Sequence, residues 1–290
     1  MISSELRQDQ TFSITTIRDL YDQFIGDRKW WRRWVFRGQE RDWALASTIE
    51  RAAEIEDIDR EKLAEIELSV LRDFRRKYEG ADRDAVQNDT LYGLSVLQHF
   101  GGPTRLLDFT YSPWVALYFA LENVGSTARV HTDDWPVVWC INADWNSETA
   151  SQRDLSGNLK PKRPDTSRNE KLFLSVYYPD NRKYSSFVHV ENPMRLHQRL
   201  VVQQGVFLCS ANLSIPSQDV LLSMPGAKDK DRIWKLRIDP RIREDVLDVM
   251  RNMNVTRASL FPGLAGFAAS YKTSLKHLEK VLAGREDSPP

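Results

Sequence analysis

A run of eight apolar residues at positions 114–121 constrains the fold more than any other part of the chain. It follows Ser112 and Pro113, which suit the N-cap and the first turn of a helix. A helix that is apolar around its whole circumference has to be enclosed by protein on every side. The run therefore predicts a core large enough to bury one helix completely.

Charge and composition exclude several classes of protein. The 290 residues contain 41 Lys and Arg and 41 Asp and Glu, so the formal net charge is 41 − 41 = 0. This balance argues against a protein that coats nucleic acid and against an acidic disordered chain. No apolar run has the length of a membrane span and no secretory signal is evident, so we expect a cytoplasmic protein without a membrane partner. Cys140 and Cys209 lie in apolar, strand-like runs and are expected to be buried reduced thiols.

Hydrophobic periodicity predicts helices mainly in the first half of the chain and strands mainly in the second. This order indicates an α+β fold, with a helical N-terminal half packed on a mixed or antiparallel sheet. A polar segment with several prolines, at 146–169, is expected to be a surface loop. The expected helices are 14–24, a long helix over 47–78, 89–100, 241–253 and 267–282, and the expected strands are 29–38, 136–141, 185–190, 206–211 and 233–238.

The densest group of polar side chains lies just before the buried helix. Free N–H groups and the dipole at a helix N-terminus favour an anion, so this segment predicts a phosphate or pyrophosphate site. In the alternative interpretation Ser112 only caps the helix, while Arg105 and Asp108 pair to fix the turn. The polar side chains between positions 98 and 112 include Gln98, His99, Thr104, Arg105, Asp108, Thr110 and Ser112.

A second candidate element is Phe36-Arg37-Gly38-Gln39, at the end of an aromatic strand. An arginine can bind phosphate or carboxylate through two parallel hydrogen bonds, and the following glycine allows close approach of the backbone. The alternative is a structural arginine that bridges loops.

Together these elements resemble the FRG domain family, which is named for its Phe-Arg-Gly motif. The likeness includes residues 97–120, residues 199–207 with Gln203-Gln204-Gly205, and the closing segment 259–266, where Gly263 and Ala265 stand in place of acidic residues that the family often carries. The resemblance implies one FRG domain over 1–290. Its core would span about 34–266, with a helical insertion at about 47–80 and a C-terminal helix at about 267–283.

A more distant resemblance connects the chain to mono-ADP-ribosyltransferases and implies a transferase-like core that binds NAD. In that comparison Arg37 and Gly38 resemble the NAD-binding Arg of the first strand, and Thr110 to Ala120 resemble the Ser/Thr-rich strand and its helix. Gln204 occupies the place of the transferase Glu, and an amide cannot stabilise positive charge as a carboxylate does. Glu191 is a candidate substitute, or else a solvated strand end. His99 would act as an acid or base or donate a hydrogen bond to nicotinamide, or else fix the turn.

These observations predict an NAD-directed enzyme, either an ADP-ribosyltransferase or an NAD glycohydrolase. The resemblance implies an effector in bacterial or phage conflict, with a small nucleotide ligand and a protein or nucleic-acid acceptor. The alternative is a non-catalytic module that binds a nucleotide or a nucleic-acid end. A nuclease is disfavoured and no metal is expected, because the acids, His131, His189, His197 and His277 lack metal-ligand spacing. The expected NAD-binding residues are Arg37, Gly38, Thr104, Arg105, Asp108, Thr110 and Ser112, and the expected catalytic ones are Arg37, His99, Gln204 and Glu191.

Overall fold

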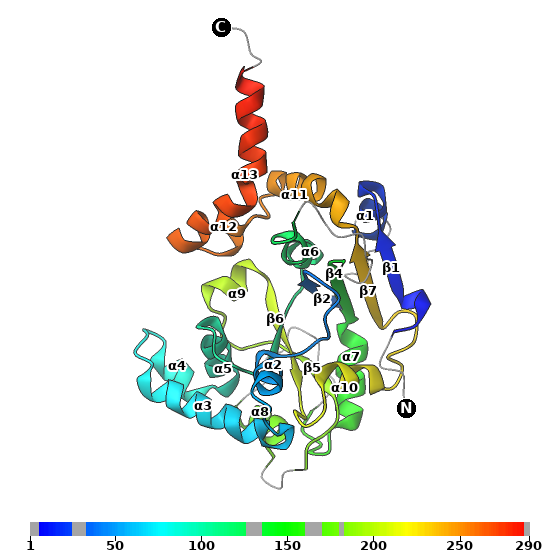
Figure 1. Cartoon of the computed structure of the whole chain (residues 1–290). Coiled ribbons are helices and arrows are strands. Elements are labelled where there is room, and N and C mark those ends of the chain that lie inside the picture. Colours follow the sequence, from blue (N-terminus) through cyan, green and yellow to red (C-terminus); the bar gives the residue numbers. More distant parts are fainter. Residues whose placement is uncertain (1–5, 25–32, 126–134, 160–169, 180–182, 287–290) are drawn as a thin grey trace.

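A seven-stranded mixed sheet forms the centre of the protein (Figure 1). The computed structural model describes residues 6–24, 33–125, 135–159, 170–179 and 183–286. The strand order is β1-β7-β4-β2-β3-β6-β5; β1 pairs with β7 in parallel, and the other described pairs are antiparallel. The expectation of an α+β fold with a mixed sheet is thus confirmed, whereas the expected order of helices in the first half and strands in the second is wrong, because four of the seven described strands lie before position 143 and helices occupy both halves. The strands are β1 (Thr11–Ile14), β2 (Trp34–Gln39), β3 (Leu106–Thr110), β4 (Val137–Asn142), β5 (Val188–Glu191), β6 (Gly205–Ser210) and β7 (Ile233–Ile238).

Helices cover both faces of this sheet and extend beyond one end of it (Figure 1). The first half contains α1 (Ile17–Phe24), α2 (Thr48–Ile55), α3 (Leu63–Lys77), α4 (Arg83–Asn88), α5 (Thr90–His99) and α6 (Pro113–Leu121). The second half contains α7 (Ala143–Arg153), α8 (Glu170–Tyr177), α9 (Gln198–Val202), α10 (Ser217–Ser223), α11 (Arg243–Asn252), α12 (Arg257–Leu260) and α13 (Leu264–Glu286). Short 3-10 turns occupy Gln8–Gln10, Arg60–Lys62 and Pro240–Ile242.

Helix α6 is the buried helix that the apolar run predicts. Ala116, Leu117, Ala120 and Leu121 are each 0 % exposed. The Ser112 hydroxyl accepts a hydrogen bond from the Val115 N–H at 3.3 Å, so the predicted N-cap is confirmed. One core packs α6, α1 and α11 against one face of the sheet.

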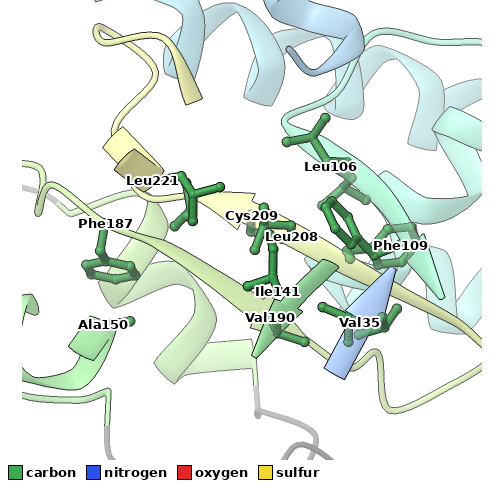
Figure 2. Packing of buried hydrophobic residues seen from close by; sticks show 14 of the residues in the cluster. Val35, Leu106, Phe109, Ile141, Ala150, Phe187, Val190, Leu208, Cys209 and Leu221 are labelled. Carbon is green, nitrogen blue, oxygen red and sulfur yellow. The ribbon is translucent and has the colours of Figure 1, made fainter. Parts of the chain in front are cut away.

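The larger core lies on the other side of the sheet and extends over β3, β5 and β6. Figure 2 shows Val35 of β2, Ile141 of β4, Val190 of β5 and Leu208 of β6 meeting in this cluster. Cys140 and Cys209 are both fully buried, as predicted. None of the helices in the described ranges is long and apolar enough to cross a membrane.

The sheet is divided between β2 and β3. Strand β2 pairs with β4 along its whole length, from Trp34 to Gln39, but its register with β3 contains one pair, Phe36 with Thr110. Beyond that pair the two strands separate. This separation positions the site described below.

Several predicted boundaries are wrong for physical reasons. The long helix over 47–78 is two helices, because Asp57 adopts a left-handed φ of 53° and Asp59 caps a new turn. Part of the expected loop 146–169 is helix α7, which Asn142 caps, while 160–169 lie outside the described residues. The helix expected over 14–24 begins at Ile17, because Ile14 is the last residue of strand β1. The first residues of the tract 29–38, up to position 32, and His131 also lie outside the described residues.

Candidate functional site

A pocket of about 770 Å³ opens where β2 and β3 separate; we call it the Arg37 pocket. Its floor comes from β2 and β3, and one wall comes from α6. The segment after β2 with α2 forms a second wall, and residues of α9 and the turn that follows it complete the pocket. The residues that line the pocket include Arg37, Gly38, Trp43, Arg51, Asp108, Thr110, Phe119, Glu122, Arg199 and Gln203.

Arg37 crosses the gap between the two strands. Its Nη1 donates a hydrogen bond to the Asp108 carbonyl oxygen at 2.7 Å, which supplies a partner where the strands no longer pair. Its Nε is buried, and no group of the described residues accepts a hydrogen bond from it. Burial lowers the pKa of Arg37; the Asp108 charge opposes this shift and the Arg51 charge adds to it. An anion in the pocket would relieve that desolvation and satisfy the Nε donor.

Gly38 lets α6 lie directly on β2. A Cβ at this position would be 1.8 Å from the Ala116 carbonyl oxygen and 2.6 Å from the Ala120 nitrogen. Because both contacts are with backbone, no rotation of a side chain can make room. The Phe-Arg-Gly element therefore combines a pocket arginine with the close packing that holds the adjacent helix wall.

The pocket carries charges of both signs. Arg37, Arg51 and Arg199 contribute positive charge. Of the lining acids, Glu122 forms an ion pair with Arg257 at 2.7 Å, and Asp108 accepts a hydrogen bond from Gln98 Nε2 at 2.8 Å. The pocket thus suits a ligand that has an anionic group and a cationic or neutral aromatic group. The other acids that line it are Glu40 and Glu54.

The amide that faces the pocket belongs to Gln203 rather than to the predicted Gln204. Gln203 is buried, lines the pocket, and donates from Nε2 to the Leu260 carbonyl oxygen at 3.0 Å. Gln204 is exposed, has a left-handed φ of 49°, and accepts a hydrogen bond from Tyr111 N through its carbonyl oxygen. The turn between α9 and β6 therefore directs one Gln inward and the next outward.

Thr110 and Ser112 already use their hydroxyl groups within the protein. The Thr110 hydroxyl donates to the Gln203 carbonyl oxygen at 2.6 Å and accepts from Ser112 N at 2.9 Å. Thr110 lines the pocket, whereas Ser112 serves as the helix cap. Thr104 is fully buried, and its hydroxyl donates to Gln98 Oε1. Of these three predicted ligand-binding residues, only Thr110 is placed at the pocket.

A smaller cavity of about 50 Å³ adjoins the Arg37 pocket and shares Asp108, Arg199 and Gln203 with it. We call it the histidine niche, because His99 and His197 also line it, with ring centroids 5.0 Å apart. Burial, with the charges of His99 and Arg199, lowers the pKa of His197 to about 4. Burial and Arg199 also lower the pKa of His99. Both imidazoles are therefore neutral near pH 7, so His99 is available as a proton acceptor.

Two further predicted site residues, Arg105 and Glu191, also lie away from the pocket. Arg105 is fully buried, and its Nε donates to Glu67 Oε2 at 2.6 Å rather than pairing with Asp108. Burial alone lowers the pKa of Arg105, but the Glu67 carboxylate raises it above its ordinary value. Glu191 is buried on β5, where it accepts a hydrogen bond from Tyr177 Oη at 2.7 Å and lies 3.0 Å from His189 Nδ1. Glu191 is therefore neither a solvated strand end nor a pocket carboxylate.

The sequence interpretation did not select several residues that line the pocket, among them Trp43, Arg51, Phe119 and Arg199. Phe119 and Arg199 lie within the segments that carry the FRG resemblance, which was the available signal for them. Trp43 and Arg51 had none, because an isolated Trp or Arg in a polar segment is common. The described residues contain no group of three or more His, Cys, Asp or Glu that could hold a metal ion.

Comparison with known proteins supports one part of the resemblance. A family model described as the FRG domain matches residues 32–129, which include β2, β3 and α6 and therefore Arg37, Gly38 and Asp108. No curated protein and no solved structure matches the chain. These comparisons do not support the more distant resemblance to ADP-ribosyltransferases.

Proposed function

We propose that the Arg37 pocket binds a nucleotide and that NAD is its favoured ligand. The observation that carries this proposal is Arg37 itself, because its buried Nε, at the floor of a large pocket, finds no acceptor among the residues that the structure describes. Small-molecule sites have volumes of about 300–1,000 Å³, and the Arg37 pocket lies in this range. Trp43 and Phe119 add aromatic surface for a base or a nicotinamide ring. NAD combines a pyrophosphate with a pyridinium ring, which matches the mixed charges of the lining.

The chemistry that these residues support best is cleavage of the bond between nicotinamide and ribose. The C1′–N bond breaks with its electron pair going to nicotinamide, which leaves as a neutral molecule. An oxygen of water or of an acceptor forms the new bond to C1′, and its proton passes to the Asp108 carboxylate. Asp108 would also stabilise the positive charge that develops on the ribose, a role for which Glu191 is too deeply buried.

Binding and turnover are measured separately to test this proposal. Titration calorimetry with NAD, ADP-ribose and ATP gives affinities, and chromatography of released nicotinamide, with and without protein or nucleic-acid acceptors, gives turnover. Arg37→Gln removes a charge-assisted contact worth about 1.5–3 kcal/mol, so we expect NAD to bind about 10- to 100-fold more weakly. Arg33→Gln is the matched control, because Arg33 is exposed and pairs with Asp144 on the surface. Equal affinities of NAD for wild type and Arg37→Gln would contradict the proposal.

The second candidate function is a non-catalytic nucleotide-binding module, and Gln203 favours it. It is the neighbour of Gln204, which the distant transferase resemblance aligns with a Glu, and an amide cannot offset a developing positive charge. Asp108→Asn separates the two functions. The enzyme should lose about 10²–10³-fold in nicotinamide release and keep its NAD affinity, because Arg37 bonds the backbone oxygen of Asp108. NAD binding without any release by the wild type would establish the module instead.

A further inference from the structure

Helix α13 extends away from the rest of the protein. It begins beside α12, with which it packs, and its second half projects beyond the sheet and its helices (Figure 1). Its 23 residues correspond to about 34 Å at 1.5 Å per residue. In proteins most of the stability of a helix comes from packing of its apolar face rather than from intrinsic helix propensity.

The helix turns its apolar side to the solvent. Leu264, Leu275 and Leu282 are 81 %, 64 % and 60 % exposed, whereas Gly266 is buried. Ser270 and Ser274 are half-buried and line a small cavity with residues of α6 and α11. Surface helices normally present the opposite arrangement, with the apolar stripe toward the core. The orientation of α13 therefore leaves an apolar stripe for another molecule to cover.

The spacing of this stripe is that of a coiled coil. The apolar residues recur in alternating steps of four and three, so they occupy the a and d positions of a heptad repeat. Phe267 and Val281 extend the stripe on its g side. We call the stripe the α13 seam; its members are Leu264, Ala268, Tyr271, Leu275, Leu278 and Leu282, all exposed.

We propose that the α13 seam pairs with the seam of a second copy of this chain in an antiparallel dimer. The charges beside the seam decide the partner and its direction. Lys272 and Glu279 are both exposed and both at e positions. In an antiparallel pair the e positions of the two helices face each other, so Lys272 of each copy lies opposite Glu279 of the other.

A parallel pair lacks this complementarity. There the e positions would face g positions, which are Phe267, Ser274 and Val281 and carry no charge. In the antiparallel pair the g positions also face each other, and the register that sets Lys272 opposite Glu279 places the uncharged Ser274 opposite Val281 of the other copy. The seam is thus complementary in charge to its own copy, and this is why a second copy, rather than a different protein, is the inferred partner.

Sedimentation velocity of the full chain between 2 and 200 µM tests the proposal. We expect the wild type to shift from monomer to dimer over this range, and Leu275→Glu with Leu278→Glu to remain monomeric at 200 µM. Leu155→Glu is the control, because Leu155 is also exposed and lies on a distant segment. Both seam residues are exposed in the monomer, so the variant should fold; far-UV circular dichroism and the thermal midpoint check this.

A charge exchange identifies the direction of pairing. Because the dimer is symmetric, either Lys272→Glu or Glu279→Lys alone creates two pairs of like charges across the seam. We therefore expect about tenfold weaker dimerisation at low salt. The two changes combined in one chain should restore the wild-type affinity. A wild type that is monomeric at 200 µM, a dimer that the seam substitutions do not affect, or a combined variant without restored affinity would each overturn the proposal.

Discussion

At the scale of single residues, Gly38 and Arg37 show how two neighbours share one motif but have separate physical roles. Arg37 presents a donor to the pocket, while Gly38 gives α6 its place against β2. Loss of the arginine should change binding and leave the fold intact. Loss of the glycine should change the fold itself.

The substitution Gly38→Ala tests this division of roles. The added methyl group would overlap the Ala116 carbonyl oxygen and the Ala120 nitrogen, so α6 would have to move. Overpacking of this kind costs about 1–3 kcal/mol, and we expect a value near 3 because the clash is with backbone. Urea unfolding measures the loss. Gly125→Ala is the control: no atom of the described residues lies within 4 Å of a Cβ there, so little change is expected.

The role of a side chain could be predicted from the sequence when its partners lie close to it along the chain. Ser112 caps the helix that begins at the next residue, so local sequence is sufficient to identify it. Arg105 pairs with Glu67, which lies 38 residues earlier, and no local pattern indicates that partner. Gln203 and Gln204 are adjacent and chemically identical. Only the left-handed backbone at Gln204 decides which of them faces inward.

At the scale of elements, hydrophobic periodicity explains both why the sequence predicted α6 and why it did not predict α7. Hydrophobic periodicity detects a helix by its apolar buried face. The buried face of α7 instead includes Asn146, Ser147 and Thr149, so its pattern resembles a loop. Asn146 shows why a polar residue is needed there: its amide bonds the backbone of β5 at Val188 and Val190, both at 2.9 Å.

The substitution Asn146→Ala should therefore destabilise the edge of the sheet. Strand β5 is the last strand on its side, and Asn146 supplies partners that a further strand would otherwise provide. Removing it leaves a buried N–H and a buried C=O unsatisfied, at a cost of about 1–3 kcal/mol each. Thermal unfolding gives the size of the effect. Asn158→Ala, at a half-buried surface position, should cost less than half as much; equal losses would contradict the edge-strand role.

The contact between α5 and α9 makes stability depend on pH. His99 ends α5, and His197 caps α9 through a hydrogen bond from Leu200 N. The niche around His197 also contains the charges of Arg199, Asp108 and Asp82. Its pKa is about 4 in the folded protein against 6.5 ordinarily, mainly because of burial. Between these values the unfolded chain binds a proton that the folded chain does not, so stability falls as the pH decreases from 6.5 toward 4.

The variant His197→Asn isolates this effect, because Asn is a good N-cap but does not titrate. We expect the urea midpoint of the wild type to decrease more than that of the variant between pH 7 and pH 4.5. NMR titration of the His197 ring gives the pKa directly. Identical pH dependence of the two midpoints would show that the niche does not hold His197 in its neutral form.

At the scale of the whole molecule, the pocket is assembled from distant segments. The FRG family match covers residues 32–129, which contribute the floor and the α6 wall. Arg199 and Gln203 close the pocket and lie about 70 positions beyond that match. The matched segment alone therefore has an incomplete pocket, and the order β1-β7-β4-β2-β3-β6-β5 explains why: β6 is the direct neighbour of β3.

The same topology predicts that local stability, the free energy needed to expose an amide to solvent, is much higher in the central sheet than in α13. Strand β4 pairs with β2 and β7 along its length and lies in the buried cores, so its amides should exchange with solvent only on global unfolding. Helix α13 packs on α12 at its beginning, and its His277 lies 3.9 Å from Asp248 of α11, so a monomer should protect the amides of its last turns little. Hydrogen–deuterium exchange with peptide mass spectrometry measures both. At 2 µM we expect protection of β4 to exceed that of α13 by at least about 10³-fold.

At 200 µM, peptides of α13 should become protected while those of β4 stay unchanged, because pairing of the seams adds contacts to α13 alone. Strong protection of α13 at 2 µM would show instead that its own protein body holds the helix.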